Sequence, residues 1–509
     1  MRFTGLKYLQ LLACLGLFAC GSAERYDVVI VGGGASGTAA GLQAARMGAR
    51  TLIVEEFDWL GGMLTSAGVS ATDGNYRLRG GIWDEFRTEL ARHYGCDSAL
   101  ITGWVSNVMF EPSVGDSIFK GLAAREPNLT VWYRSAAETA EREKDVWRLG
   151  VRRDGRLRQV EADVLVDATE LGDVARMAGV PYDVGMDSSA VTHEDIAPAE
   201  ANGIVQDLTY VAVLKDYGRD VTIPRPDGDD PSLFACCCVN DLCVAPKEPH
   251  RMWSREMMIT YGKLPNGKYM INWPIEGNDY YVDMIDMTPE ERADAVRRAK
   301  NHTLSFVYFL QHELGFNTLG LADDEFPTED RLPFIPYHRE SRRIHGAVRF
   351  TLNDITDPYA GTLYRTAVGV GDYPVDQHHT RYSGWDELPD LYFHPVPSYG
   401  FPLGIVIPAG FPVVLVDRIF ETKKYSSVCV SNFQPIYRSV CRLAGKGDQR
   451  IGIIGAPPRL SSTQERISAY RQAVADCGLP EDEHLIQYGD SLENSACACL
   501  DQLLERKCD

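Results

Sequence analysis

Short apolar runs alternate with a longer Ala-rich stretch near the start of the chain. Asp27 to Val31 and Thr51 to Val54 are β-branched runs that are too short for core helices, and they predict buried parallel strands. Thr38 to Met47 lies between them and predicts a helix. Strand, helix and strand in this order predict an α/β fold.

Further along, the pattern predicts a β-rich region and then a long amphipathic helix. The predicted elements are a helix around Trp83 to Tyr94, strands at Leu129 to Tyr133, Val146 to Val151 and Val164 to Val166, and a helix from Pro289 to Leu314. The charged side chains at the start of the last helix (Glu290, Glu291, Arg292 and Asp294) predict a solvated face rather than a site.

Three glycines follow the first predicted strand at GxGxxG spacing. Gly32 permits a tight turn, Gly34 lets the backbone approach a pyrophosphate, and Gly37 lets the helix pack closely on the strand. The helix that begins near Ala35 and Ser36 directs its free N–H groups at the phosphates.

The second predicted strand ends in two acids. Glu55 falls where such folds hydrogen-bond the ribose hydroxyls, and Glu56 follows it. Strand, glycines, helix, strand and acid together predict a dinucleotide site, although they do not say which dinucleotide it binds. A glycine-rich turn without a ligand is the alternative.

Two further motifs carry a resemblance to a known family. Leu60 to Thr65, with Gly61, Gly62 and Met63, resembles the segment beneath the flavin in FAD-dependent oxidoreductases of the glutathione-reductase type. Asp167-Ala168-Thr169, followed by Gly172-Asp173, is similar to a segment that returns to the cofactor in these proteins.

Within that group, residues 25 to 409 resemble the secreted bacterial FAD-dependent oxidoreductase family. The resemblance implies FAD as cofactor, with Asp173 close to it, and a small-molecule substrate. The sequence departs from many flavoproteins at Glu170, which stands where they have glycine.

A histidine pair supplies the candidate proton acceptor. Asp372 to His379 is similar to a segment of the family. We expect His378 or His379 to take a hydroxyl proton while hydride leaves the substrate carbon, with Asp372 or Asp376 orienting the imidazole. A structural role for two adjacent histidines is the alternative.

Two other clusters leave alternatives open. Asn272, Trp273, Tyr280 and Tyr281 suit either a pocket wall that stacks on a polar ring, such as a sugar, or a packed sheet edge. The arginines of residues 339 to 343 suit either binding of a substrate carboxylate or of the cofactor pyrophosphate, or a salt-bridged helix end.

Charge and the N-terminus bear on partners and location. Lys+Arg 51 against Asp+Glu 71 gives a net charge of −20, which opposes nucleic-acid binding.

A basic start and the apolar run Tyr8 to Phe18 predict a signal segment. Leu17-Phe18-Ala19-Cys20 resembles a bacterial lipobox, which implies cleavage after residue 19 and a lipid anchor on Cys20. A plain secretory signal is the alternative.

Cysteines gather in two places. For Cys236, Cys237, Cys238 and Cys243 we prefer buried small hydrophobes to a disulfide or a metal site, and no metal is expected. Six more cysteines lie in the last hundred residues, which is typical of a reducing compartment.

The pattern changes near Ala409. Residues 411 to 509 resemble an interior fragment of the effector-binding domain of lac-repressor-type regulators, a partial periplasmic-binding-protein-like α/β fold. Arg450 to Gly455 predicts a strand and Thr463 to Cys477 a helix. We infer a chimera, with divergence of the flavoprotein end as the alternative. We also expect Val413 to Val416 to pair beside the Asp27 to Val31 strand, because strand pairing uses backbone hydrogen bonds and does not depend on the side chains.

Five segments follow from these patterns. They are a signal peptide (1–20), the first part of a Rossmann-like FAD-binding domain with a β-meander (21–180), an inserted mixed α+β substrate domain (181–330), the return to the FAD-binding domain (331–409) and the regulator fragment (410–509). The expected function is FAD-dependent oxidation of a small polar, carbohydrate-related substrate. An inactive fusion and a non-enzymatic binding protein are the alternatives. Substrate, electron acceptor and oligomeric state stay open.

Overall fold

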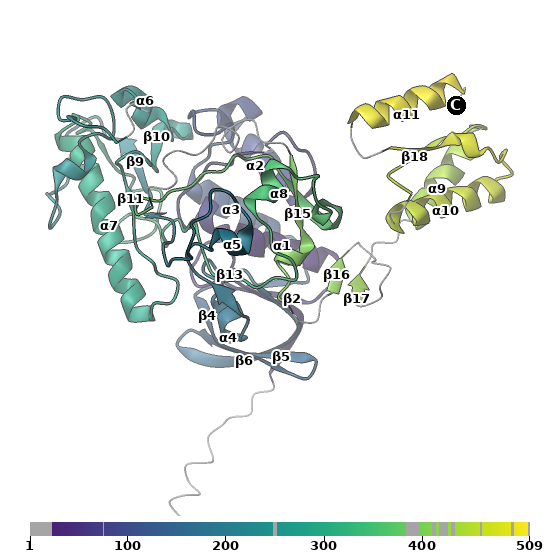
Figure 1. Cartoon of the computed structure of the whole chain (residues 1–509), viewed down its shortest axis with the longest axis horizontal. Helices are drawn as coiled ribbons and strands as arrows, with labels where there is room; N and C mark the ends of the chain where they lie inside the picture. The colour runs from purple at the N-terminus through teal and green to yellow at the C-terminus, as the bar shows by residue number, and fades with distance from the viewer. Residues whose placement is uncertain are drawn as a thin grey trace, which may run out of the picture. The chain divides into compact units, whose positions relative to one another are not determined.

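The computed structural model describes residues 23–74, 76–247, 252–382, 398–409, 414–416, 426–428, 433–458, 461–489 and 493–506 (Figure 1). It divides the chain into two compact units, Met1–Ala409 and Gly410–Asp509. Among the helices of the described residues, none combines the length and the apolar character that a membrane span needs.

A six-stranded sheet with the order β3-β2-β1-β6-β5-β4 is the centre of the nucleotide-binding part. Its strands are β1 (Glu24–Val31), β2 (Thr51–Val54), β3 (Leu129–Trp132), β4 (Ser135–Glu143), β5 (Val146–Arg153) and β6 (Arg156–Asp167). The helices of this part are α1 (Ala35–Arg46), α2 (Gly81–Tyr94), α3 (Pro112–Ala124) and α4 (Asp173–Met177). The predicted strand–helix–strand unit and the helix near Trp83 are confirmed.

The sheet is covered on both faces because side chains alternate along each strand. Ile30 of β1 and Ile53 of β2 pack with α1, α2 and α3 side chains such as Phe86 and Phe119. Val29 of β1 packs on the other face, among residues of the three antiparallel strands. The nucleotide-binding strands are therefore buried on both sides, as a parallel sheet requires.

Strand β6 belongs to both halves of this sheet. Its first part pairs antiparallel with β5, from Arg156 to Ala162. Its last part pairs parallel with β1, from Val160 to Asp167. The β-meander therefore returns the chain directly to the end of β1, where the cofactor motifs lie. Strand β4 was not predicted, because its exterior positions are polar and its sequence, Ser135–Glu143, has few β-branched residues.

The second part of this unit is built around one long helix. Its strands are β7 (Tyr182–Asp183), β8 (Leu208–Thr209), β9 (Ala212–Asp216), β10 (Lys268–Ile271), β11 (Asp279–Tyr280), β12 (Leu319–Leu321), β13 (Arg343–Ile344), β14 (Ala367–Gly371) and β15 (Tyr399–Pro402). Its helices are α5 (Ser189–Thr192), α6 (Arg255–Thr260), α7 (Pro289–His312) and α8 (Leu352–Thr356). Figure 1 labels this helix α7. It begins with a capping box between Thr288 and Glu291, and its apolar face forms the core with β9 and β10.

The Trp273 stretch packs in this core. Trp273 is 3% exposed, and its indole N–H donates to the Cys237 carbonyl at 2.8 Å. Asn278 is fully buried and donates to the carbonyls of Tyr210 and Ile271. Of the two interpretations, the packed one fits these contacts, so they give no support for a sugar-stacking wall.

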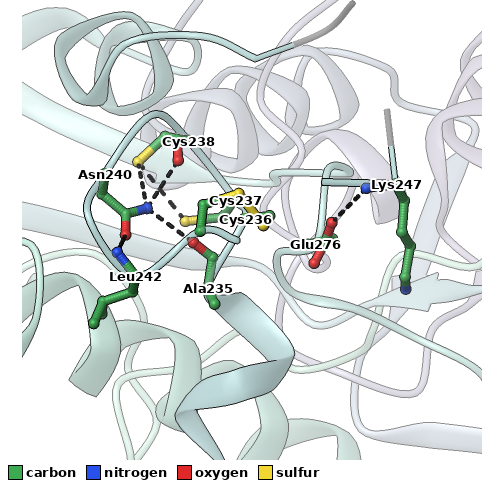
Figure 2. Close-up of a disulfide and its surroundings, with 9 residues drawn as sticks. Ala235, Cys236, Cys237, Cys238, Asn240, Leu242, Lys247 and Glu276 are labelled. Atoms are coloured by element: carbon green, nitrogen blue, oxygen red, sulfur yellow. Dashed lines mark hydrogen bonds between the residues drawn. A yellow bond between two sulfur atoms is a disulfide. The ribbon is translucent and has the colours of Figure 1, made fainter. Parts of the chain in front are cut away.

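The four clustered cysteines include a disulfide, contrary to the preferred interpretation. Cys236 and Cys243 are bonded and close a short loop. Cys237 and Cys238 are buried thiols, and the Asn240 amide donates to the carbonyls of Ala235 and Cys238 inside the loop (Figure 2). The loop between the two cysteines folds back and brings Cys243 next to Cys236. The spacing of the cysteines in the sequence does not predict this fold of the loop.

The second unit is a small α/β arrangement. Its elements are β16 (Val414–Val416), β17 (Ser426–Val428), α9 (Phe433–Ala444), β18 (Ile453–Gly455), α10 (Ser461–Asp476), β19 (Ile486–Tyr488) and α11 (Glu493–Glu505). Helices α9 and α10 share a core that includes Val440 and Tyr470. The predicted strand near residue 453 and the predicted helix near residue 470 are confirmed.

The predicted pairing of Val413 to Val416 beside the first strand is wrong. Residue 413 lies outside the described residues, and Val414–Val416 pairs in parallel with Ser426–Val428. The physical reason is that β1 is already paired on both edges, with β2 and β6. No strand slot beside it is open.

A buried ion cluster joins the two parts of the first unit. The Lys268 ammonium on β10 lies 2.8 Å from Glu111, directly before α3, and 2.7 Å from Glu325. All three side chains are nearly fully buried. Glu111 also accepts hydrogen bonds from Tyr94 and Asn266, so its charge is fully partnered.

Replacing Lys268 with Ala should destabilise the protein by about 3–5 kcal/mol, because two carboxylates would stay buried without their cation. Lys215 is the matched control: it stands opposite Lys268 in the β9–β10 pair but its ion pairs are more exposed. Lys215→Ala should cost less than about 1 kcal/mol. Urea unfolding of both variants measures the difference, and equal losses would contradict this account.

Candidate cofactor and proton-transfer site

Three turns meet at the carboxyl ends of β1, β2 and β6. Gly61 donates its N–H to the Gly33 carbonyl at 2.8 Å, so the first and second turns are hydrogen-bonded to each other. A Cβ built on Gly32 would lie 2.2 Å from the Ala168 carbonyl oxygen of the third turn. A Cβ on Gly37 would lie 2.0 Å from the Gly32 carbonyl oxygen. Gly32 and Gly37 are therefore required by the fold itself.

Gly34 is different. Its φ of −59° is available to any residue, and a Cβ built on it would meet nothing closer than a Glu170 carboxylate oxygen at 3.4 Å. The fold does not require glycine here. A ligand that approaches the backbone does, because a side chain would occupy its place.

The start of α1 suits the phosphates of such a ligand. The N–H groups of the first helical turn, including those of Ala35 and Ser36, have no acceptor within the helix. Together with the helix dipole they favour an anion. Thr38 secures the turn through a 2.8 Å hydrogen bond from its hydroxyl to the Gly33 carbonyl.

Glu55 follows β2, and its carboxylate lies against the backbone of the first turn. Its carboxylate accepts hydrogen bonds from the N–H groups of Gly33 at 2.6 Å and Phe57 at 2.9 Å. Burial raises the pKa of Glu55 to about 7, and these two hydrogen bonds oppose the rise. Glu56 points to a different environment, near Asp173 and Arg292, and burial raises its pKa also.

The segment beyond Met63 offers polar atoms without partners. Gly62–Leu64 forms one 3-10 turn, after which the hydroxyl oxygens of Ser66, Ser70 and Thr72 are buried without a hydrogen bond in the structure. Buried hydroxyls normally have partners. Their position, directly after the segment that resembles the flavin-binding one, suits the polar edge of a flavin.

Asp173 begins α4 and is held by two arginines. Arg292 binds both of its carboxylate oxygens, at 2.7 and 2.8 Å, and Arg342 binds one at 2.7 Å. Burial would raise the pKa of Asp173, but these arginines hold it below its usual value. The sequence predicted a solvated face for Arg292, and this prediction is wrong. Arg292 of α7 instead binds Asp173 at the start of α4.

The arginines of residues 339 to 343 are likewise paired internally. Arg339 binds Asp279 at 3.2 Å, Arg342 binds Asp173, and Arg343 binds Asp187 at 3.3 Å. The contacts fit the ion pairs of the second interpretation, but Arg343 lies on strand β13 and not at a helix end.

His378 is the histidine that the structure equips for proton transfer. Its Nδ1 lies 2.5 Å from Asp279, and its Nε2 lies 3.5 Å from Asp376. Burial opposes protonation, yet the hydrogen bonds to Asp279 and Asp376 raise the pKa of His378 above its ordinary value. Burial of its carboxylate would raise the pKa of Asp279, but Arg339 and His378 hold it below its ordinary value.

The backbone around His378 is fixed by β8 and the residues before it. Asp207 donates its N–H to the His378 carbonyl at 2.7 Å and accepts two hydrogen bonds from Thr380. The sequence missed both Asp207 and Asp279 as site residues. Asp279 lies in a stretch that resembles the family. An acidic residue within that stretch was therefore the one sequence feature that could have pointed to Asp279 as a site residue.

The other predicted members have different surroundings. His379 contacts Gln377 through Nε2 at 2.6 Å, and burial lowers its pKa to about 4. Asp372 lies beside Gly74, where a carboxylate oxygen is 3.0 Å from a Cβ built on that glycine. Of the two aspartates offered as the orienting group, Asp376 is the one near His378, and Asp279 is the closer partner.

Asp73 links the cofactor segment to the His378 loop. It follows the buried hydroxyls and hydrogen-bonds Ser106 and Tyr373. Burial raises the pKa of Asp73 to about 6, and the nearby Asp376 raises it further. The chain from Met63 to Asp73 therefore connects the glycine turns to the loop that carries Tyr373 and Asp376.

A family model described as FAD dependent oxidoreductase matches residues 27–421. The chain belongs to the FAD-dependent oxidoreductase family. The residues described above fit FAD: Gly34 leaves its backbone open, α1 offers N–H groups, and Glu55 stands near the ribose position. Bound there, FAD would supply a hydride acceptor.

The chain is also similar to HTH-type transcriptional regulators over a short stretch. It is 32% identical over 103 residues to the regulator CelR of Thermobifida fusca, covering 20% of this chain and 30% of CelR. It is 27% identical over 94 residues to the repressor CytR of Escherichia coli strain K12, covering 18% and 28%. The chain thus spans about 30% of the length of these regulators, and the two similarities are consistent with a chimera.

Solved structures are similar to each part. The p-nitrophenol 4-monooxygenase PnpA of Pseudomonas putida DLL-E4 has 12% identity and a TM-score of 0.29, covering 64% of this chain and 70% of PnpA. The CelR–cellobiose complex has 30% identity and a TM-score of 0.18, covering 20% and 32%.

Replacing Gly34 with Val should abolish FAD binding while the protein still folds. The Cβ has room in the fold but lies where the pyrophosphate would approach, and the loss of a good helix cap costs only about 1 kcal/mol. Gly121→Val in α3 is the control, since a Cβ there meets nothing within 4 Å and the position lies away from the three turns. Visible absorption of the purified proteins measures bound flavin, and a yellow Gly34→Val protein would contradict this assignment.

Proposed function

We propose that residues 24–409 of this FAD-dependent oxidoreductase remove a hydride from a carbon that bears a hydroxyl group, in a small polar substrate. The observation that carries this proposal is the buried His378–Asp279 pair. The link from the cofactor segment through Asp73 and Tyr373 supports its nearness to the flavin.

His378 takes the hydroxyl proton in this proposal. Its Nδ1–H donates to Asp279, so in the neutral ring Nε2, which lies 3.5 Å from Asp376, carries no proton and can accept one. Asp279 orients the ring and stabilises the imidazolium that forms, while Arg339 keeps Asp279 ionised. Loss of the proton and loss of the hydride together convert the alcohol to a carbonyl compound.

The pH dependence follows from the raised pKa of His378. The neutral ring is the active form, so kcat/KM should rise with pH through a midpoint above the ordinary value of 6.5. Asp279→Asn removes the charge that raises this pKa, so the midpoint should move to lower pH while the maximum rate falls because the ring loses its orientation.

Reduction of the flavin by a panel of small alcohols, followed by stopped-flow absorbance, measures both quantities. His378→Gln should lower the rate by about 10²–10⁴-fold. The exposed His312, replaced by Gln, is the control and should leave the profile unchanged. An Asp279→Asn midpoint that does not move, or moves upward, would refute the role of this pair.

We also propose that the chain is exported and held to a bacterial membrane by a lipid on Cys20, which lies outside the described residues. The disulfide between Cys236 and Cys243 supports an oxidising compartment. The cysteines of the second unit belong to the regulator-like part and do not bear on this argument.

Changing Cys20 to Ser should release the protein from the membrane fraction or leave its precursor uncleaved. Radiolabelled palmitate incorporation and fractionation of cells that express the chain test this directly. Cys96→Ser, at an exposed thiol, is the control and should behave as the unmodified chain does. Equal membrane partitioning of the Cys20→Ser protein would rule the anchor out.

A further inference from the structure

Glu170 stands at the one position of the third turn where the sequence departs from many flavoproteins. Its carboxylate extends over the start of α1. Oxygen Oε1 lies 3.4 Å from a Cβ built on Gly34 and 2.7 Å from one built on Gly62. An acidic side chain thus occupies the space that the two glycines leave open.

This space is the one that suits a pyrophosphate. The N–H groups at the start of α1 and the helix dipole attract negative charge there, whether it comes from a phosphate or from a carboxylate. A carboxylate and a pyrophosphate cannot both occupy it, because they overlap and repel each other.

The surroundings of Glu170 do not neutralise it. Within the described residues, no ion pair to Glu170 is present in the structure. The charged group that faces it is Glu55, from the end of β2, which has the same sign. The nearby Asp173 is neutralised by Arg292 and Arg342, so these arginines are committed elsewhere.

We propose that the Glu170 carboxylate competes with the FAD pyrophosphate for the start of α1, and thereby sets how tightly this chain holds its cofactor. When Glu170 is ionised, FAD binding requires that the side chain turn away. When Glu170 is protonated, the repulsion is absent and the affinity rises.

The pH dependence has a definite sign. Loss of water around its carboxylate raises the pKa of Glu170 above its ordinary value, although the residue as a whole is exposed. FAD affinity should therefore increase as pH falls through this raised pKa. The pKa of Glu55 is also raised by burial, so the effect of Glu170 is isolated by comparing variants at each pH.

The test is titration of the full chain, freed of FAD, with FAD, followed by quenching of flavin fluorescence. At pH 8, Glu170→Gln should bind FAD at least tenfold more tightly than the unmodified chain. The two affinities should converge as the pH falls and Glu170 becomes protonated. Glu141→Gln on the exposed strand β4 makes the same change in net charge and should alter neither affinity.

Adenosine diphosphate separates the pyrophosphate from the flavin. It carries the pyrophosphate and the ribose but no isoalloxazine, so Glu170→Gln should strengthen its binding by a similar factor, measured by calorimetry. A gain for FAD without a gain for adenosine diphosphate would overturn the proposal, because the effect would then act on the flavin ring.

Glu170→Asp provides a second variant in case the amide disturbs the turn. The aspartate keeps the negative charge, but its side chain is one methylene shorter and holds the carboxylate farther from the start of α1. Its FAD affinity should therefore lie between those of the unmodified chain and Glu170→Gln. An unchanged or weaker affinity of Glu170→Gln at pH 8 would also overturn the proposal, since Glu170 would then assist the cofactor. These measurements read binding directly and do not depend on turnover by His378.

Discussion

The close contact of three backbone turns is the constraint on which the rest of the first unit depends. Gly32 lies against the Ala168 carbonyl, Gly37 lies against the Gly32 carbonyl, and Gly62 lies against Gly34. These approaches are closer than any side chain allows. They bring the ends of β1, β2 and β6 together, and so place the α1 start and Glu55 around one space.

Charged side chains then fix how the second part of the unit joins these turns. Asp173 is bound by Arg292 of α7 and by Arg342, while Lys268 of β10 binds the acid that precedes α3. Each pair is at least partly buried, so removing one partner leaves a costly uncompensated charge. Such pairs specify the register between the parts more strictly than apolar packing does.

The candidate chemistry depends on the same principle of paired buried charge. His378 and Asp279 come from segments 99 residues apart, and Asp207 holds the histidine backbone from a third segment. The chemical groups are ordinary, and their arrangement gives His378 a raised affinity for a proton. In contrast, the second unit has its own core and its own sheet pairings, β16 with β17 and β18 with β19.

The sequence by itself determined the elements whose causes are local. The run Asp27 to Val31, the glycines at GxGxxG spacing and the acid Glu55 are contiguous, so their pattern predicts strand, turn, helix and cofactor class correctly. Tertiary structure decided what depends on distant partners: the place of β6 beside β1, the disulfide of Cys236 with Cys243, and Asp279 as the partner of His378. The physical reason is that burial and pairing of charge are properties of the folded chain, and no local periodicity encodes which of 71 acidic side chains a given base will meet.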